Sequence, residues 1–591
     1  MIRRTLILLV IALVALTIFA TSSVGGSEER TVGLFLNEAG ALDGYTLFGP
    51  LRSGTTYLID NDGMVVHSWE SEYRPGAVTI LLENGHLLRS AKLDTEIFTA
   101  GGSGGRIEEY DWDGNLVWEY EYASDQYFAH HDISVLPNGN VLILAWDRKT
   151  REDAIAAGRD PRLLEDDELW AEQIVEVRPT GASGGEIVWQ WSLWDHVIQD
   201  DDYFVANFGI VANNPQLIDI NYFNPSRPEG GEDDWVHGNS LDYNAELDQI
   251  MISARHFDEL WIIDHSTSTA EAASHSGGTS GMGGDILYRW GNPQAYRAGD
   301  AEDQTLFLQH DAQWIRPGLP GEGNILVFNN GNGRTPENYS SVDELVPPVD
   351  DSGNYALTPG EAFGPDSLTW TYEAPTPTDF YSSFVSGAQR LSNGSTLVAA
   401  GAQGAIFEVM PDGQIVWRYV NPVTADGPLA LGDPIPEGSN IIFRAYRFEP
   451  DFPAFEGKDL APQGPIELEK GSIPPTPTAT DEVTPETPTN TPLPPTLTPT
   501  STPVPPTLTP TNTPVPPTPT ATEEPALTGD VNNDASITSV DALLVLQYVA
   551  NLLEALANLG NADVNADGNI DSVDAALILQ HVAGLLPSLP P

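Results

Sequence analysis

A short repeated sequence motif predicts the fold, and its clearest copy is Phe407-Glu-Val-Met-Pro-Asp-Gly413-Gln-Ile-Val-Trp417. Apolar residues alternate with polar ones on both sides of Asp412-Gly413, and the second run ends on tryptophan. Asp-Gly between two such runs is typical of a β-hairpin turn. The phrase recurs in Leu58–Trp69 and Glu109–Trp118, and looser copies end at Trp189, Trp290 and Trp370.

Six such hairpins over about 420 residues, without helical periodicity, predict a single radial architecture. A propeller repeats one small sheet around an axis and thereby avoids long exposed sheet edges. We therefore expect an all-β six-bladed β-propeller over residues 32–455.

A second phrase precedes the hairpins and carries histidine. His131 and His237 each stand seven residues before a turn asparagine, and His310 fits the same frame with an insertion before the turn. Ala77 and Ser386 occupy the corresponding position of two other copies. Equivalent positions of a propeller converge where the innermost strands begin, so we expect the three histidines to meet at the central channel. Histidines that merely tie blades together are the structural alternative.

A ring of imidazoles can bind an anion, act as a nucleophile, or serve as general acid and base. Arg255 follows His237 by eighteen residues in the same repeat. A planar cation beside imidazoles suits a tetrahedral oxyanion. The ring could also ligate a metal, but Asp132 and Asp311 are the carboxylates that the repeat supplies, and we expect them to orient their neighbours instead.

The large domain resembles the bacterial arylsulfotransferase family in the His130-His131-Asp132 run, in His237-Gly-Asn239, in Arg255 and in His310-Asp311. That resemblance implies transfer of a sulfuryl group from an aryl sulfate to a phenolic acceptor, without the nucleotide donor PAPS or any other cofactor. It also implies roles for individual residues. His310 would be the nucleophile and form a sulfohistidine, with His131, His237 and Arg255 as further catalytic residues and Asn239, Ser386 and His130 as substrate contacts.

Two other functions fit the same residues. The propeller could be a non-catalytic binding module, or it could be an aryl sulfatase that uses water as the acceptor.

The C-terminal segment, residues 527–588, contains two twelve-residue loops rich in oxygen side chains, each followed by an apolar-periodic run. Such loops suit Ca²⁺, and their tandem repetition argues against chance. The expected calcium ligands are Asp530, Asn532, Asp534, Ser536 and Asp541 in the first loop, and Asp563, Asn565, Asp567, Asn569 and Asp574 in the second. The segment resembles a type I dockerin, a small α-helical module with two EF-hand-like calcium loops, and this implies docking onto a cohesin module of a scaffold or surface protein.

The remaining segments indicate where the protein works. Residues 456–526 are rich in Pro and Thr and predict an extended linker. Residues 1–27 combine Arg3-Arg4 with an apolar run, which predicts a signal peptide or an N-terminal anchor. We expect a secreted, extracellular protein, either free, associated with the cell surface, or anchored in the membrane through this segment.

The composition excludes several classes of function. The formal net charge is −59, and binding to nucleic acid rests on Lys and Arg that this chain largely lacks. The absence of cysteine rules out disulfides and thiolate metal sites.

Overall fold

The computed structural model describes residues 30–164, 168–223, 233–472 and most of 528–589. The predicted signal segment and most of the predicted linker lie outside these ranges. The chain divides into two compact units, Met1–Glu482 and Val483–Pro591.

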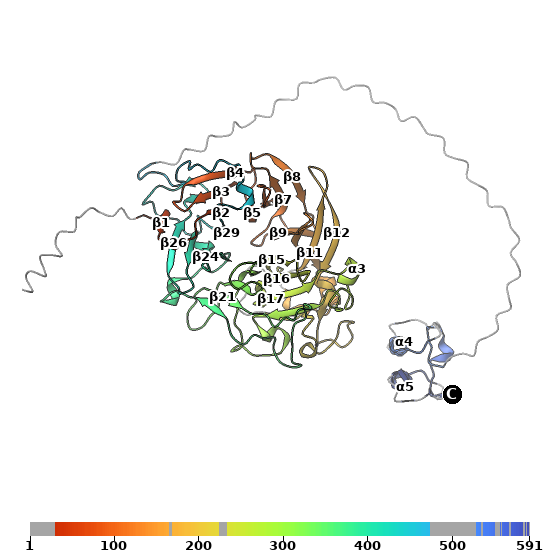
Figure 1. Cartoon of the computed structure of the whole chain (residues 1–591). Helices are drawn as coiled ribbons and strands as arrows, with labels where there is room; N and C mark the ends of the chain where they lie inside the picture. Colours follow the sequence, from red (N-terminus) through yellow and green to blue (C-terminus); the bar gives the residue numbers. More distant parts are fainter. Residues whose placement is uncertain are drawn as a thin grey trace, which may run out of the picture. The chain divides into compact units, whose positions relative to one another are not determined.

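The first unit is a six-bladed β-propeller, as predicted, with its blades arranged around one axis (Figure 1). Each blade is an antiparallel sheet of four strands, except that the sixth has five. Blades two and three contain β5 (Pro75–Leu81), β6 (Leu87–Lys92), β7 (Gly105–Tyr110) and β8 (Leu116–Glu121), then β9 (Tyr127–Val135), β10 (Val141–Thr150), β11 (Glu168–Pro179) and β12 (Gly185–Ser192). Blades four and five contain β15 (Gly238–Asn244), β16 (Gln249–Ala254), β17 (Glu259–Asp264) and β18 (Ile286–Trp290), then β19 (His310–Trp314), β20 (Ile325–Asn329), β21 (Ser341–Leu345) and β22 (Trp370–Tyr372).

Blades one and six are built from both ends of the propeller sequence. Blade one joins β2 (Tyr45–Pro50), β3 (Thr55–Asp60) and β4 (Val65–Glu70) to the last strand, β29 (Ile442–Phe448). Blade six joins β23 (Gly387–Arg390), β24 (Thr396–Ala400), β25 (Ala405–Val409) and β26 (Ile415–Val420) to the first strand, β1 (Gly33–Asn37). The ring is therefore closed by backbone hydrogen bonding in two neighbouring blades.

The connections contain a few short elements. These are α2 (Arg151–Ala156), α3 (Thr269–Ala272), the parallel pair β13 (Val197–Ile198) and β14 (Ile218–Asp219), and the antiparallel pair β27 (Val423–Thr424) and β28 (Gly427–Pro428).

The repeated tryptophan of each hairpin has a structural reason. Each indole N–H donates a hydrogen bond to the next blade, five times to a backbone oxygen and once to the Thr267 hydroxyl, over 2.8 to 3.1 Å. The donors and acceptors are Trp69 to Asp111, Trp118 to Gly184, Trp189 to Thr267, Trp290 to Pro365, Trp370 to Pro411 and Trp417 to Asn61. The last of these returns to blade one, so the six bonds form a closed ring.

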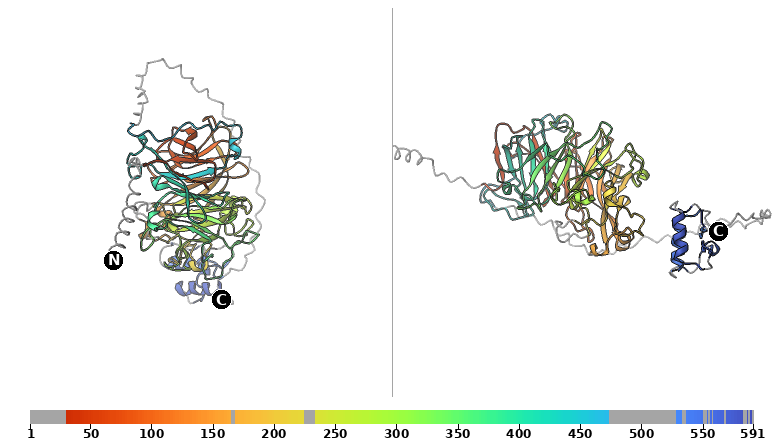
Figure 2. Two further views of the ribbon diagram at one scale, coloured as in Figure 1. Left: turned by 60° about the vertical axis from the view of Figure 1, so that its left-hand side comes forward. Right: turned by 90° about the horizontal axis from the view of Figure 1, so that it is seen from below.

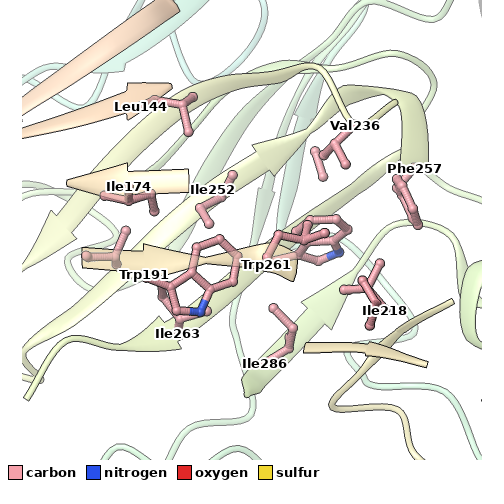
Figure 3. Close-up of a cluster of buried hydrophobic side chains, with 14 of the residues drawn as sticks. Leu144, Ile174, Trp191, Ile218, Val236, Ile252, Phe257, Trp261, Ile263 and Ile286 are labelled. Atoms are coloured by element: carbon pink, nitrogen blue, oxygen red, sulfur yellow. The ribbon is translucent and has the colours of Figure 1, made fainter. Parts of the chain in front are cut away.

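Apolar side chains fill the space between adjacent blades. Figure 3 shows the largest such cluster, where Ile174 and Trp191 of blade three face Ile252 and Trp261 of blade four. Trp261 and Ile252 are fully buried. Each aliphatic side chain of this kind stabilises the fold by about 1.5–3 kcal/mol.

The propeller's packed segment extends past residue 455, into residues that the composition assigned to the linker. Gln463 N donates to Val65 O over 2.8 Å, and Leu468 N donates to Leu429 O over 3.0 Å. Ile466 between them is buried.

The second unit is small and helical. Its helices α4 (Ser539–Val549) and α5 (Ser572–Val582) pack against each other (Figure 2). Val545 and Ile578 are fully buried in their shared core.

Candidate active site

The three histidines of the repeat lie on or directly beside innermost strands. His131 is in β9, His237 directly precedes β15, and His310 begins β19. The pairing of all three strands shifts register near the histidine, which marks a β-bulge. His131 and His237 also adopt left-handed backbone angles, with φ of 50° and 53°. Bulges redirect side chains, and such backbone strain is concentrated at functional sites.

The rings of His131 and His237 meet across two blades. Their centroids are 4.6 Å apart, in an edge-to-face arrangement. Gly102 makes room for this pair, because a Cβ atom at that position would lie 2.1 Å from the His131 ring. Burial lowers the pKa of both rings well below 6.5, and so does the proximity of Arg255 and of the other histidines, so both rings are neutral at pH 7.

Asp234 and His256 position His237 and Arg255. The carboxylate of Asp234 contacts Nδ1 of His237, while its backbone oxygen lies 2.9 Å from Nδ1 of His256. Nη1 of Arg255 donates to Nε2 of His256 over 3.0 Å. Since arginine can only donate, Nε2 accepts and Nδ1 of His256 carries the proton.

Arg255 supplies the site's positive charge. Burial lowers its pKa to about 10, which still leaves the guanidinium protonated at neutral pH. Its Nε atom is buried and has no hydrogen-bond partner among the described residues. An unsatisfied buried donor is costly, and an anion would satisfy it.

Asn330 fixes the tautomer of His310. The Nδ2 atom of Asn330 donates to the backbone oxygens of Ser382 and Val385, so its Oδ1 faces Nδ1 of His310 at 2.7 Å. Nδ1 of His310 must therefore carry hydrogen, and Nε2 keeps its lone pair. Burial, and next the positive charge of Arg255, lower the pKa of His310 well below 6.5. The ring is thus neutral at pH 7, with the lone pair of Nε2 available.

Asn239 and His130, which the sequence predicts as substrate contacts, are both buried. Asn239 is fully buried, donates to Gln309 O over 2.7 Å, and has an unpartnered Oδ1 among the described residues. His130 lies behind His131, stacked on Trp146 with centroids 4.1 Å apart. Its Nε2 contacts Glu172 and its Nδ1 contacts His131.

Ser386 is held within its own blade. Its hydroxyl donates toward Ser382 and Phe384 and accepts from Gly401 N. Because these bonds occupy the hydroxyl, the geometry does not favour the predicted contact between Ser386 and sulfate.

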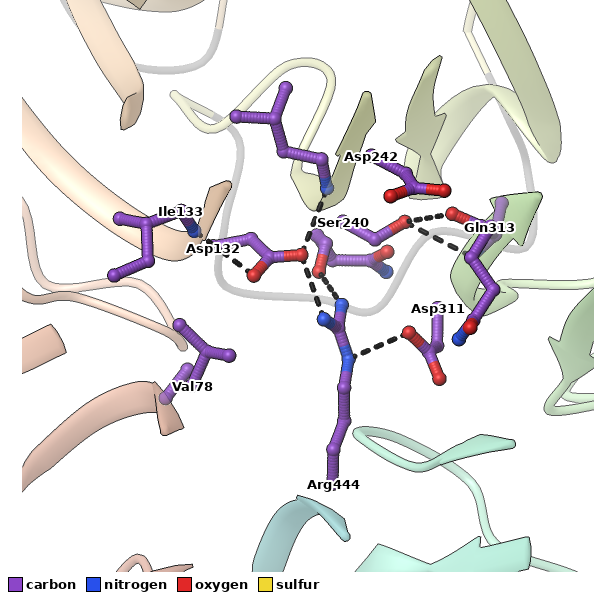
Figure 4. Close-up of polar contacts among 12 residues, drawn as sticks. Val78, Asp132, Ile133, Ser240, Asp242, Asp311, Gln313 and Arg444 are labelled. Atoms are coloured by element: carbon purple, nitrogen blue, oxygen red, sulfur yellow. Dashed lines mark hydrogen bonds and ion pairs between the residues drawn. The ribbon is translucent and has the colours of Figure 1, made fainter. Parts of the chain in front are cut away.

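A buried arginine that the sequence pattern did not reveal forms the floor of the site. Arg444 in β29 lies between Asp132 and Asp311, with contacts of 2.8 and 2.9 Å (Figure 4). It also donates to Asn239 O over 3.1 Å. One guanidinium thus ties together the strands that carry His131, His237 and His310. The carboxylates of the repeat bind this arginine, whereas Asp234 and Asn330 orient the histidines.

Burial raises the pKa of Asp311 to about 6, against the opposing effect of Arg444. Beyond Arg444 lies a cavity of about 200 Å³, lined by Asp242, Gln313 and Arg316 among others.

The residues of the C-terminal loops fit a bound cation. The last position of each loop, Asp541 and Asp574, is fully buried, and each carboxylate accepts a backbone N–H from the loop's second residue over 2.9 Å. The sequence contains no Lys or Arg after Lys470, so no cationic side chain of this module offsets these buried charges. Buried carboxylates of this kind need a cation. The predicted ligands Asp534 and Asp567 lie outside the described residues.

Comparison with known proteins places both units. The arylsulfotransferase (ASST) family matches residues 51–416, and the dockerin type I domain matches residues 528–583. The chain therefore belongs to the arylsulfotransferase family and carries a C-terminal type I dockerin domain.

Two relatives and one solved structure illustrate these matches. Arylsulfate sulfotransferase AssT of Lelliottia amnigena is 23% identical over 65% of this chain and 64% of its own length, and AssT of Escherichia coli O6:H1 (strain CFT073) is 23% identical over 65% and 63%. The chain thus spans less than two thirds of these relatives. A ScaB dockerin solved with a cohesin of Acetivibrio cellulolyticus is 31% identical over 11% of this chain and 92% of that chain, with a TM-score of 0.11.

Among the described residues, no helix has both the length and the apolar character needed to cross a membrane.

Proposed function

We propose that the propeller transfers a sulfuryl group from an aryl sulfate to a phenolic acceptor through a sulfohistidine on His310. The observation that carries this proposal is the pairing of a neutral His310, whose Nε2 lone pair is kept available by Asn330, with the buried cation Arg255. A nucleophile next to an anion-binding cation suits attack on a sulfate ester.

In the first half-reaction, the Nε2 lone pair of His310 attacks the sulfur atom. The S–N bond forms while the bond from sulfur to the aryl oxygen breaks, and that oxygen leaves with the electron pair. His131 or His237 gives it a proton, and phenol departs. This proton is taken up from solvent with the anionic donor, because the donor's negative charge raises the pKa of the adjacent ring.

In the second half-reaction, the acceptor's oxygen attacks the same sulfur. Its proton passes to the imidazole that served as the acid, and the S–N bond breaks with return of the electron pair to Nε2. Asn330 accepts a hydrogen bond from Nδ1 of His310 but is too weak a base to take the proton. The sulfonated ring therefore stays cationic and remains a good leaving group.

A chromogenic aryl sulfate, supplied with and without phenol, tests this function. Phenol-stimulated release of the chromophore together with formation of phenyl sulfate supports transfer. Release that does not depend on phenol supports the aryl sulfatase, and no release supports a non-catalytic binding module. Either of the last two results would contradict the proposal.

We expect the acid limb of the pH profile to lie below pH 6.5. His310 must be neutral to attack, and its lowered pKa keeps it neutral as the pH falls to values that would protonate an ordinary histidine. The measurement is single-turnover phenol release between about pH 5 and pH 8. A rate that is lost as the pH falls, with its midpoint above pH 7, would be inconsistent with His310 as the attacking group.

We further propose that the protein is exported and that its dockerin domain attaches it to a cohesin module when the two loops hold Ca²⁺. The buried Asp541 and Asp574, in a module that lacks Lys and Arg, support the calcium requirement.

Removing calcium is expected to unfold the dockerin domain and leave the propeller intact. Buried carboxylates would lose the only cation available to them, and metal binding in such modules is coupled to folding. Circular dichroism should lose helical signal on addition of a chelator, while tryptophan emission stays constant because all 14 tryptophans precede residue 418. An unchanged helical signal would contradict the calcium assignment.

A further inference from the structure

We propose that His196, His275 and Asp285 bind a divalent transition-metal ion, best matched by Zn²⁺, at the outer junction of blades three and four. His196 follows β12, His275 follows α3, and Asp285 directly precedes β18. One ligand atom from each residue lies within 4.8 Å of the other two. None of the three belongs to the catalytic ring or to the calcium loops.

The first argument is the orientation of His196. This ring is fully buried, and its Nε2 lies 2.8 Å from the backbone oxygen of Ala272. That nitrogen must carry hydrogen, because a carbonyl can only accept. In the neutral ring, Nδ1 then directs a lone pair at Oδ1 of Asp285, 2.8 Å away. Two electron pairs facing each other need a proton or a metal ion between them. A histidine held by a backbone carbonyl through one nitrogen is the usual arrangement of a metal ligand.

The second argument is that His275 points at the same oxygen. Its Nδ1 lies 2.7 Å from Oδ1 of Asp285, and its ring centroid is 5.8 Å from that of His196. Neutral His275 can donate to this oxygen from Nδ1, but His196 can do so only as an imidazolium, because its other nitrogen is already committed to Ala272 O. A single divalent ion satisfies both nitrogens and the carboxylate with one centre of charge.

The third argument is that the buried half of the site is rigid. His196 stacks on Trp191 with ring planes 6° apart, and the indole of Trp191 donates to Gly284 O over 2.8 Å. A Cβ atom at Gly284 would lie 2.6 Å from Nε2 of His196, so only glycine fits there. The side chain of His275 is 61% exposed. Zn–ligand distances of about 2.0–2.2 Å separate ligands more widely than these contacts, so binding requires the Asp285 carboxylate to turn away from Nδ1 of His196 and the exposed ring of His275 to move outward.

The donor set identifies the metal class. Two imidazoles and one carboxylate suit Zn²⁺ and its neighbours, whereas Ca²⁺ and Mg²⁺ prefer oxygen alone. Three protein ligands leave a fourth position for water.

Zinc binding by the full-length protein, with Ca²⁺ in excess to occupy the dockerin loops, tests the proposal. Competition against a chromogenic zinc chelator should give one more equivalent of bound Zn²⁺ for the native protein than for His275→Ala. His86→Ala is the matched control, since His86 is a partly exposed histidine that also contacts a carboxylate, that of Glu109. Any zinc bound by the histidines of the active site is common to all three proteins and cancels.

A thermal measurement guards against misfolding of the variant. Zn²⁺ should raise the melting temperature of the native protein and of His86→Ala by more than that of His275→Ala. Equal stoichiometry in native protein and His275→Ala, or equal thermal shifts, would overturn the proposal.

Discussion

Replacing His310 with alanine is expected to lower the release of phenol from an aryl sulfate by at least about 10³-fold. The change removes the one Nε2 lone pair that Asn330 holds available. It should also eliminate the covalent intermediate. Mass spectrometry of native protein incubated with donor alone should find a sulfuryl adduct on the peptide that contains His310, and the same peptide of the variant should be unmodified.

His86→Ala serves as the control for this experiment, because His86 lies in the turn between β5 and β6, is partly exposed and pairs with Glu109. It should retain native turnover. An active His310→Ala protein would exclude His310 as the nucleophile, and an adduct on another residue would identify the correct one.

Arg444→Met is expected to destabilise the propeller by about 3–5 kcal/mol. The change leaves Asp132 and Asp311 buried without the cation that lies between them. Denaturant unfolding followed by tryptophan emission measures the effect, since every tryptophan lies in the propeller. Arg418→Met is the control, because Arg418 is an exposed arginine on β26.

The loss of unfolding free energy caused by Arg444→Met should depend on pH. Without the guanidinium, the pKa of Asp311 rises above its value of about 6, so the folded variant takes up protons more readily than the unfolded chain. Stability relative to the native protein should therefore recover as the pH falls. A deficit below about 1 kcal/mol, equal to that of the control, would contradict the role assigned to Arg444.

The repeat made the fold and three of the site's histidines predictable. Asp-Gly turns and terminal tryptophans recur because every blade needs the same hairpin and the same indole hydrogen bond to its neighbour. Equivalent positions on a ring converge, so His131 and His237 could be placed together from sequence, as their contact confirms.

The partners of these histidines could not be predicted in the same way. Asp234 and Asn330 lie in connections that differ from blade to blade, so no period marks them. Arg444 was missed for another reason. It follows Phe443, which occupies the sixth ring position without a histidine, and its strand pairs with β2 about 400 residues earlier. The turn at Pro450-Asp451, seven residues after Phe443, is the sequence signal that could have identified this sixth copy of the repeat.

The pairing of β29 with β2 determines when the propeller and its candidate site can be completed during synthesis. Five of the innermost strands, with all three ring histidines, have emerged from the ribosome before β29. Arg444 arrives only with that last strand, which also completes blade one. A nascent chain truncated before residue 442 therefore has both strands that close blade six, β1 and β26, but lacks the cation that lies between Asp132 and Asp311. Completion of blade one and assembly of the candidate site therefore depend on the same seven residues.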